Sequence, residues 1–124
     1  MKKIYVAGAY SADNVISVLQ NIGRGQHYAS MLLSRGYAPF CPWLDKEYVI
    51  NNYLEPPPLQ QFYDYSTAWL SVSDAMFVVP DLPGLNSWRN SMGTKQEIHF
   101  AFENNIPVFY NLEELEEWGK NESK

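Results

Sequence analysis

Apolar residues along the chain form short continuous runs that alternate with longer stretches of helical period. Short runs rich in β-branched and aromatic residues are typical of strands buried in a parallel sheet. The longer stretches repeat apolar residues every three or four positions, which indicates amphipathic helices. We expect strands at 3–8, 37–41, 74–80 and 106–110, and helices at 12–34, 59–73, from the Gly93–Thr94 turn to about 105, and after Asn111.

Capping and turn residues set the predicted ends of these elements. Ser11 is placed to cap the first helix, and Gly36 to end it in a left-handed conformation. Pro39 favours an edge position for the second strand, since proline cannot donate to a central ladder. Asn111 is expected to cap the last helix, with Glu114 three residues later completing a pattern close to a capping box.

The segment from Trp43 to Pro58 gives two open interpretations. Residues 46–54 predict either a helix or another ordered excursion, and Pro56-Pro57-Pro58 forms a stiff break. Connections of this length are often binding loops. Its tryptophan and tyrosine side chains either stack on a base or close a small core.

Strands and helices alternate along the whole chain, which predicts an α/β fold with helices on both faces of a mostly parallel sheet. At 124 residues the chain is expected to be a single domain spanning 1–124.

Composition limits the partners. The net charge is −5, but four of the acidic residues lie in the last helix (Glu113, Glu114, Glu116, Glu117). Without them the chain has nine basic and ten acidic residues. No basic stripe of the kind that a nucleic-acid polymer requires is present. A lone Cys41 excludes an intrachain disulfide and fits a reducing cytoplasm. No run approaches a membrane span or signal peptide, so we expect a cytoplasmic protein without membrane association.

The chemistry-bearing stretch is Asn90–Glu97, which follows a Pro/Gly-rich loop and opens a helix. Gly93 is predicted to turn the backbone, Thr94 to cap the helix, and Glu97 to lie one turn in, at the carboxyl edge of the sheet where such folds bind small molecules. The competing interpretation is structural, because Thr94-x-x-Glu97 is itself a capping-box sequence. His27 and His99 fit ordinary surface or core roles, and no cluster has metal-ligand spacing, so neither a metal nor another cofactor is expected.

Three motifs in order resemble the nucleoside 2-deoxyribosyltransferase superfamily, which includes the transferases and the nucleoside 5′-monophosphate N-glycosidases. They are Tyr5-Val-Ala-Gly8, Ser73-Asp74-Ala75, and Ser91-Met-Gly-Thr-Lys-Gln-Glu97 followed by Ala101. The resemblance covers nearly the whole chain. It implies a flavodoxin/Rossmann-like three-layer sandwich with four to five strands, and a homo-oligomer whose sites border a neighbouring subunit.

The resemblance also assigns roles. Glu97 matches the glutamate that attacks the anomeric carbon, Tyr5 lies where a hydroxyl holds that glutamate, and Asp74 matches the aspartate that contacts the leaving base. The substrate would be a nucleoside 5′-monophosphate or a (deoxy)nucleoside, and the bond cleaved its N-glycosidic bond, by hydrolysis or by transfer to a second base. The residues expected to bind substrate are Gly8, Ser11, Arg89, Ser91, Gly93 and Thr94.

The chain departs from the family pattern in two places. Ser91 stands where the transferases carry an aspartate and resembles the serine that receives a 5′-phosphate in the glycosidases, which favours a nucleotide. The glycosidases also carry Ser and Arg in the first loop, where this chain has Ala9 and Ser11, and Arg89 is a candidate for the missing cation.

Two other functions stay open. A catalytically silent nucleotide-binding module would keep the pocket without turnover. The lysine-decarboxylase-like phosphoribohydrolases also use a Gly-Thr-x-x-Glu turn, but their contiguous glycines are missing before Gly93.

Overall fold

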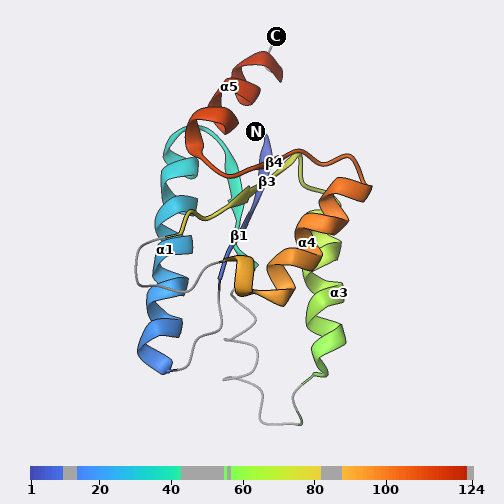
Figure 1. Cartoon of the computed structure of the whole chain (residues 1–124). Helices are drawn as coiled ribbons and strands as arrows, with labels where there is room; N and C mark the ends of the chain where they lie inside the picture. The colour runs from blue at the N-terminus through green and yellow to red at the C-terminus, as the bar shows by residue number, and fades with distance from the viewer. Residues whose placement is uncertain (10–13, 43–54, 56, 82–87, 123–124) are drawn as a thin grey trace.

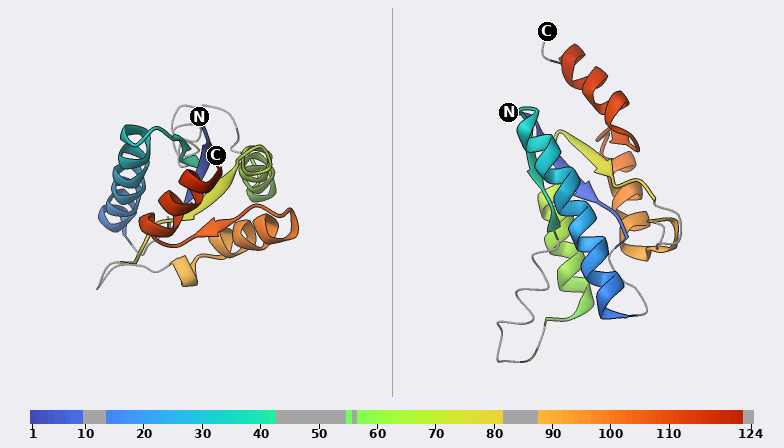
Figure 2. Two further views of the ribbon diagram at one scale, coloured as in Figure 1. Left: turned by 90° about the horizontal axis from the view of Figure 1, so that it is seen from above. Right: turned by 90° about the vertical axis from the view of Figure 1, so that its left-hand side faces the viewer.

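The computed structural model describes residues 1–9, 14–42, 55, 57–81 and 88–122. Over these residues the chain is a three-layer α/β sandwich, with a parallel sheet between two layers of helices (Figures 1 and 2). The fold class predicted from the alternating pattern is therefore confirmed. None of the helices in these ranges is long and apolar enough to cross a membrane. In chain order the elements are β1 (Lys3–Ala7), α1 (Val15–Ser34), β2 (Ala38–Phe40), α3 (Leu59–Leu70), β3 (Ala75–Val78), the 3₁₀ turn η2 (Trp88–Asn90), α4 (Met92–Glu103), β4 (Val108–Phe109) and α5 (Leu112–Glu122).

The four described strands run in the order β2-β1-β3-β4, and each neighbouring pair is parallel. The register places Ile4 opposite Ala75 and Ala7 opposite Val78 in the two central strands. β2 lies at one edge, which confirms the position that Pro39 predicted.

The alternation of side chains along β1 divides the core into two clusters. Ile4 and Val6 face α1 and α5, whereas Tyr5 and Ala7 face α3 and α4. Figure 2 shows the sheet enclosed in this way, with α1 on one side and α3 and α4 on the other. Tyr5 is fully buried, which is unusual for a side chain with a polar end. The buried members facing α1 and α5 are Ile4, Val6, Ile22, Leu32, Ala75, Phe77, Val79 and Leu115; those facing α3 and α4 are Tyr5, Ala7, Leu70, Met76, Val78 and Ala101.

Helix α1 begins later than predicted. Its N-cap is Asn14, which has an extended backbone and whose side-chain oxygen accepts the N–H of Ser17 at 2.9 Å. The prediction that Ser11 caps this helix is therefore wrong, and Ser11 itself lies outside the described residues. The predicted stop is confirmed: Gly36 has a φ of +93°, and the N–H of Tyr37 returns to the Leu32 carbonyl as in a Schellman motif.

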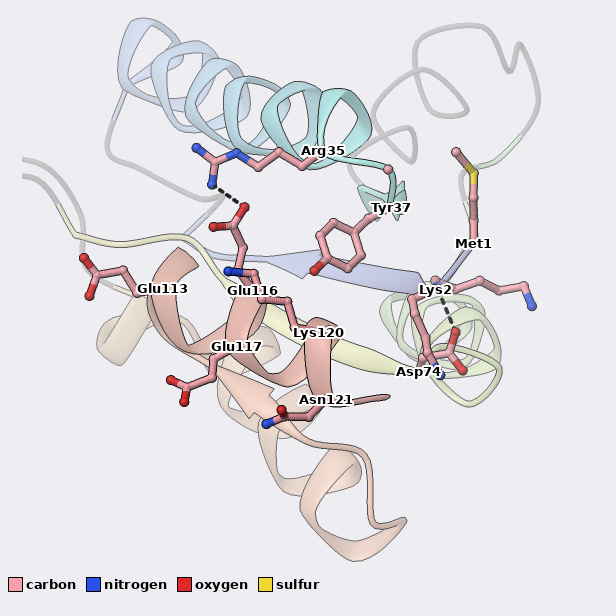
Figure 3. A pocket seen from close by; sticks show the side chains of 13 residues that line it. Met1, Lys2, Arg35, Tyr37, Asp74, Glu113, Glu116, Glu117, Lys120 and Asn121 are labelled. Atoms are coloured by element: carbon pink, nitrogen blue, oxygen red, sulfur yellow. Dashed lines mark hydrogen bonds and ion pairs between the residues drawn. The ribbon is translucent and has the colours of Figure 1, made fainter. Parts of the chain in front are cut away.

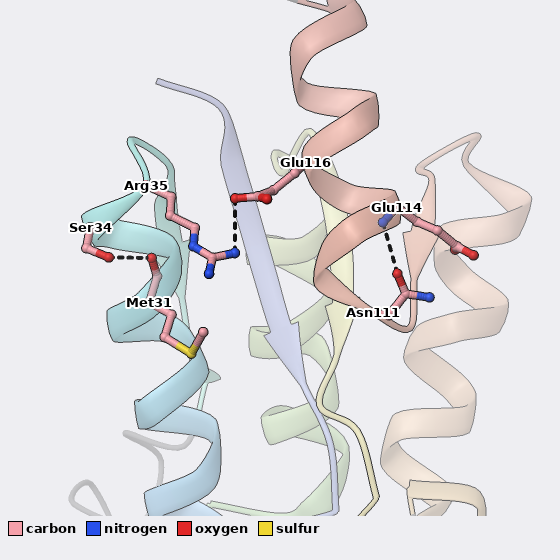
Figure 4. A network of polar contacts seen from close by, with 6 residues as sticks. All are labelled: Met31, Ser34, Arg35, Asn111, Glu114 and Glu116. Atoms are coloured by element: carbon pink, nitrogen blue, oxygen red, sulfur yellow. Dashed lines mark hydrogen bonds and ion pairs between the residues drawn. The ribbon is translucent and has the colours of Figure 1, made fainter.

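The last helix docks on the amino-terminal edge of the sheet. The Asn111 side chain caps it by accepting the N–H of Glu114 at 2.9 Å, as predicted (Figure 4). Leu115 is fully buried in the core, and Arg35 pairs with Glu116 at 3.0 Å. Because that ion pair is solvent-exposed on both sides, it adds little stability. Burial of Leu115, rather than charge, therefore holds α5.

Gly119 of α5 is packed against the Tyr37 side chain. A Cβ at position 119 would lie 2.1 Å from the Tyr37 hydroxyl oxygen, closer than two such atoms can approach. A larger residue here would therefore displace the Tyr37 ring, so glycine allows that ring to pack closely against α5.

We predict that Gly119→Ala lowers the free energy of unfolding by about 1–3 kcal/mol, because the added methyl group forces α5 and Tyr37 apart. Urea denaturation measures the change. Gly23→Ala is the matched control, since it lies within α1 and no atom of the described residues approaches its added carbon within 4 Å. The free energy of unfolding of this control should rise by about 0.4–1 kcal/mol. Equal responses of the two variants would contradict the packing explanation.

Candidate active site

At the carboxyl ends of β1 and β3 the connections of the chain turn toward opposite edges of the sheet. After β1 the chain crosses by α1 to β2, and after β3 it crosses by α4 to β4 on the other side. Open α/β sheets bind small molecules at such a switch point. Gly8 follows β1, and Asp81 follows β3. The start of α4 lies near the carboxyl end of β1 (lower part of Figure 1).

Ser91, and not Thr94, is the N-cap of α4. Its side chain accepts the backbone N–H of Thr94 at 3.3 Å, and the helix begins at Met92. The predicted capping role of Thr94 is therefore wrong. The hydroxyl of Thr94 instead donates to the Gly8 carbonyl at 2.9 Å and ties the start of α4 to the end of β1. Thr94 is buried, so this bond is shielded from water.

The protons in this small network can be assigned by counting. Thr94 carries one hydroxyl proton, and the Gly8 carbonyl oxygen can only accept, so that proton goes to Gly8. The 3.0 Å contact between the Ser91 and Thr94 hydroxyl oxygens must then use the proton of Ser91. In this geometry Ser91 accepts from Thr94 N–H and donates to the Thr94 oxygen.

The position of the cap changes the meaning of Glu97. With Ser91 as N-cap, the third helical residue is Thr94, and Glu97 lies too far along the helix to complete a capping box. The structural interpretation of Thr94-x-x-Glu97 is therefore excluded. Glu97 is half-buried, one of its carboxylate oxygens (Oε2) is shielded from solvent, and it lies one turn before the fully buried Ala101. Burial of a carboxylate costs free energy, so the position of Glu97 needs an explanation other than helix capping.

Tyr5, in the centre of β1, places its hydroxyl beside the Glu97 carboxylate. Burial raises the pKa of Tyr5 well above its usual value of 10.0, and the negative charge of the neighbouring Glu97 raises it further. The Ser66 side chain has a smaller, opposite effect and lowers the pKa of Tyr5. Among the described residues none meets the Tyr5 hydroxyl oxygen with full hydrogen-bond geometry. Tyr5 is thus a neutral donor beside the carboxylate at physiological pH.

Arg89 lies at the same edge but is engaged. Its guanidinium forms an ion pair with Asp81 and lies over the Trp88 ring, 4.6 Å from the ring centroid. The Asp81 carboxylate also accepts the backbone N–H of Trp88 at 3.2 Å. Asp81 therefore fastens η2 to the end of β3, and the charge of Arg89 is already balanced.

Asp74 is not part of this site. It directly precedes β3 and accepts the backbone N–H of Lys3 at 2.7 Å, at the amino-terminal edge of the sheet. Figure 3 shows it lining an open groove beneath α5 that Lys2 and Lys120 also line. The prediction that Asp74 contacts the leaving base is therefore corrected, because Glu97 and Tyr5 approach each other on the face covered by α3 and α4.

The two predicted glycines occupy different settings. Gly8 is buried, and its carbonyl receives the bond from Thr94. Gly93 lies inside α4 without a left-handed conformation, so it makes no sharp turn, contrary to prediction. A Cβ at position 93 would meet Tyr63 of α3 at 3.5 Å, an ordinary contact.

Comparison with known proteins supports the fold alone. The chain superposes on a 2-deoxyribosyltransferase from the psychrotolerant bacterium Bacillus psychrosaccharolyticus with a TM-score of 0.59 and 16% identity, covering 86% of this chain and 69% of that one. A conserved protein from Enterococcus faecalis V583 gives a TM-score of 0.59 and 21% identity, covering 87% of this chain and 61% of that one. No family model and no curated protein matches the sequence. The chain therefore has the fold of a nucleoside 2-deoxyribosyltransferase, as the resemblance implied.

We predict that Thr94→Val lowers the free energy of unfolding by about 1–3 kcal/mol, because the buried Gly8 carbonyl loses its donor while the side-chain volume is kept. Thr67→Val is the control. Among the described residues the Thr67 hydroxyl bonds only to carbonyls of its own helix, at 2.9 Å and 3.2 Å, so we expect a change within about 0.5 kcal/mol. Urea denaturation of both variants makes the comparison, and equal losses would show that the Gly8 contact has no special importance.

The raised pKa of Tyr5 predicts loss of stability in alkali. Above about pH 10 tyrosine ionises in the unfolded chain while Tyr5 stays protonated in the folded one, so the unfolded state binds fewer protons. The free energy of unfolding therefore falls as pH rises above 10, and Tyr5→Phe should reduce this slope. Denaturation at pH 8 to 11 measures it. Tyr110→Phe, at an exposed ring, is the control, and an unchanged slope in Tyr5→Phe would contradict the expectation.

Proposed function

We propose that this chain cleaves the N-glycosidic bond of a nucleoside, with Glu97 as the nucleophile. The observation that carries the proposal is the partly buried Glu97 carboxylate beside the buried Tyr5 hydroxyl, on the helix that starts at the switch point of the sheet. Its location has no structural explanation as a helix cap. The shared fold with a 2-deoxyribosyltransferase supports the same substrate class.

The chemistry suits a carboxylate. As the bond between the anomeric carbon and the base lengthens, positive charge develops on the sugar ring, and a carboxylate beneath that carbon stabilises it. A Glu97 oxygen then bonds to the anomeric carbon, and the bonding electrons leave with the base, which takes up a proton. In the second step water or another base attacks the same carbon and releases the carboxylate. One difficult displacement is thereby divided into two easier ones.

Tyr5 is proposed to orient Glu97. Because the pKa of Tyr5 is well above 10.0, its hydroxyl keeps its proton and can donate to the carboxylate throughout the physiological range. A neutral donor holds one oxygen of Glu97 without a competing charge, which leaves the second oxygen for the anomeric carbon. No role is proposed for Asp74, which lies at the opposite edge of the sheet.

The geometry favours a nucleoside without a 5′-phosphate, contrary to what Ser91 suggested from sequence. The Ser91 proton is used inside the protein, and Arg89 is paired with Asp81. A phosphate at this edge would compete with both interactions for a donor and a cation. A sugar hydroxyl requires neither, because it can donate to neutral oxygens.

The test is release of free base from a panel of nucleosides, 2′-deoxynucleosides and their 5′-monophosphates, with and without an acceptor base. Glu97→Gln should lower the rate by about a thousandfold or more, because the nucleophile is lost while the shape is kept. Glu103→Gln makes the same change at an exposed position on the same helix and should retain full activity. Release from nucleosides should exceed release from monophosphates.

Four results would count against the proposal. Full activity of Glu97→Gln would show that Glu97 is not the nucleophile. If it is the nucleophile, intact-mass measurement of a quenched reaction should show a sugar adduct on wild type but not on Glu97→Gln, and an adduct on both would contradict the proposal. Preference for monophosphates would reject the unphosphorylated substrate. Tight nucleoside binding by calorimetry without any product would favour the silent binding module.

A further inference from the structure

Helix α1 lies on the outside of the sandwich and turns an uncharged face to solvent (Figure 2). Arg24 is the one formally charged residue of this helix, and its Nε and Nη1 atoms are shielded from solvent. The exposed face of α1 therefore combines uncharged polar residues with large apolar ones. The large apolar side chains that are 58–73% exposed on this helix are Val15, Ile16, Leu19 and Leu33.

The other described helices present charged side chains to solvent. Asp64 is exposed on α3, Lys95 and Glu103 on α4, and Glu113 on α5. Phe102 of α4 is 81% exposed, but it directly precedes Glu103. Single exposed apolar residues of this kind are normal on a protein surface, whereas a continuous uncharged face with several of them marks an interaction site.

Six exposed residues of α1 follow one another at alternating spacings of three and four. This is the spacing of a seam along which two helices pack side by side. The spacing is the same when read from either end, and its middle coincides with the middle of the helix. These residues, named here the α1 stripe, are Ile16, Leu19, Gly23, Gln26, Ser30 and Leu33.

An antiparallel copy of the α1 stripe would match large residues with small ones. Leu19 would lie against the small Ser30 of the other copy. Gly23, which has no atom within 4 Å of an added Cβ, leaves room for the longer side chain of Gln26. A parallel copy would instead place Leu19 on Leu19 and leave the space at Gly23 empty. The antiparallel pairs are Ile16 with Leu33, Leu19 with Ser30, and Gly23 with Gln26.

We propose that the α1 stripe is the contact between two copies of this chain, packed antiparallel about a two-fold axis. Such an interface uses the same patch on both copies and must therefore fit itself. Each copy carries a net charge of −5, so a contact through charged helices would bring like charges together, whereas the α1 stripe opposes no charges.

This contact is separate from the candidate active site. Helix α1 covers one face of the sheet, and Tyr5 faces the other. It therefore differs from the arrangement that the family resemblance implies, in which the sites border a neighbouring subunit. The inference does not depend on the proposed function, and its test needs no activity.

The size of the contact determines how strongly the copies associate. A helix of 20 residues is about 30 Å long. One helix from each copy gives an interface at the small end of the specific ones, which commonly bury about 800 Å² per partner. We therefore expect a dimer that dissociates on dilution.

Sedimentation equilibrium over about 1–100 μM tests the proposal, because this range covers the dissociation constants expected of a small interface. The wild-type mass should rise toward twice 14.3 kDa as concentration increases. Leu19→Glu should raise the dissociation constant about a hundredfold, because each dimer buries this side chain twice. Phe102→Glu is the matched control: it makes the same kind of change at a more exposed apolar residue and should leave the association unchanged.

A charge pair tests the antiparallel arrangement. Ile16→Lys alone should weaken association, and adding Leu33→Glu should restore it about tenfold, because each lysine then faces a glutamate of the other copy. Circular dichroism should show unchanged helix content in every variant, since all the altered positions are exposed. A wild type that is monomeric throughout the range, or an assembly that Leu19→Glu does not weaken, would overturn the proposal. A double variant no tighter than Ile16→Lys would overturn the antiparallel pairing.

Discussion

The bond from the Thr94 hydroxyl to the Gly8 carbonyl is the constraint on which the candidate site depends. It joins the end of β1 to the start of α4, two segments 86 residues apart in sequence. Both partners are buried, so neither can exchange the bond for water. Because the helix start is held there, its second turn brings Glu97 beside the Tyr5 hydroxyl. A strand and a helix that are only packed together could slide, whereas these share a fixed point.

The fold could be predicted from sequence to a large extent because its signals are local or periodic. Continuous apolar runs marked the central strands, Gly36 marked a left-handed helix end, and Pro39 marked an edge strand. The helix starts were less accurate. Ser11 and Asn14 are both good caps, as are Ser91 and Thr94, and a sequence does not show which of two nearby polar residues adopts the extended backbone of a cap.

The site was predicted only in part, for reasons of geometry. Glu97 and Tyr5 were identified through the resemblance, and the structure brings them together. Asp74 was assigned to the same site although it precedes its strand, and in a parallel sheet the residue before a strand lies at the edge opposite the carboxyl ends.

The position of α5 has a consequence for how the protein can evolve. This helix and its contacts with Arg35 and Tyr37 lie at the amino-terminal edge, away from the first turns of α4 (Figures 1 and 3). Substitutions there change the stability of the chain without touching the groups proposed to do chemistry. Selection can therefore adjust thermal tolerance and substrate preference on separate sets of residues. A destabilising change near Glu97 can be compensated from the far side of the sheet.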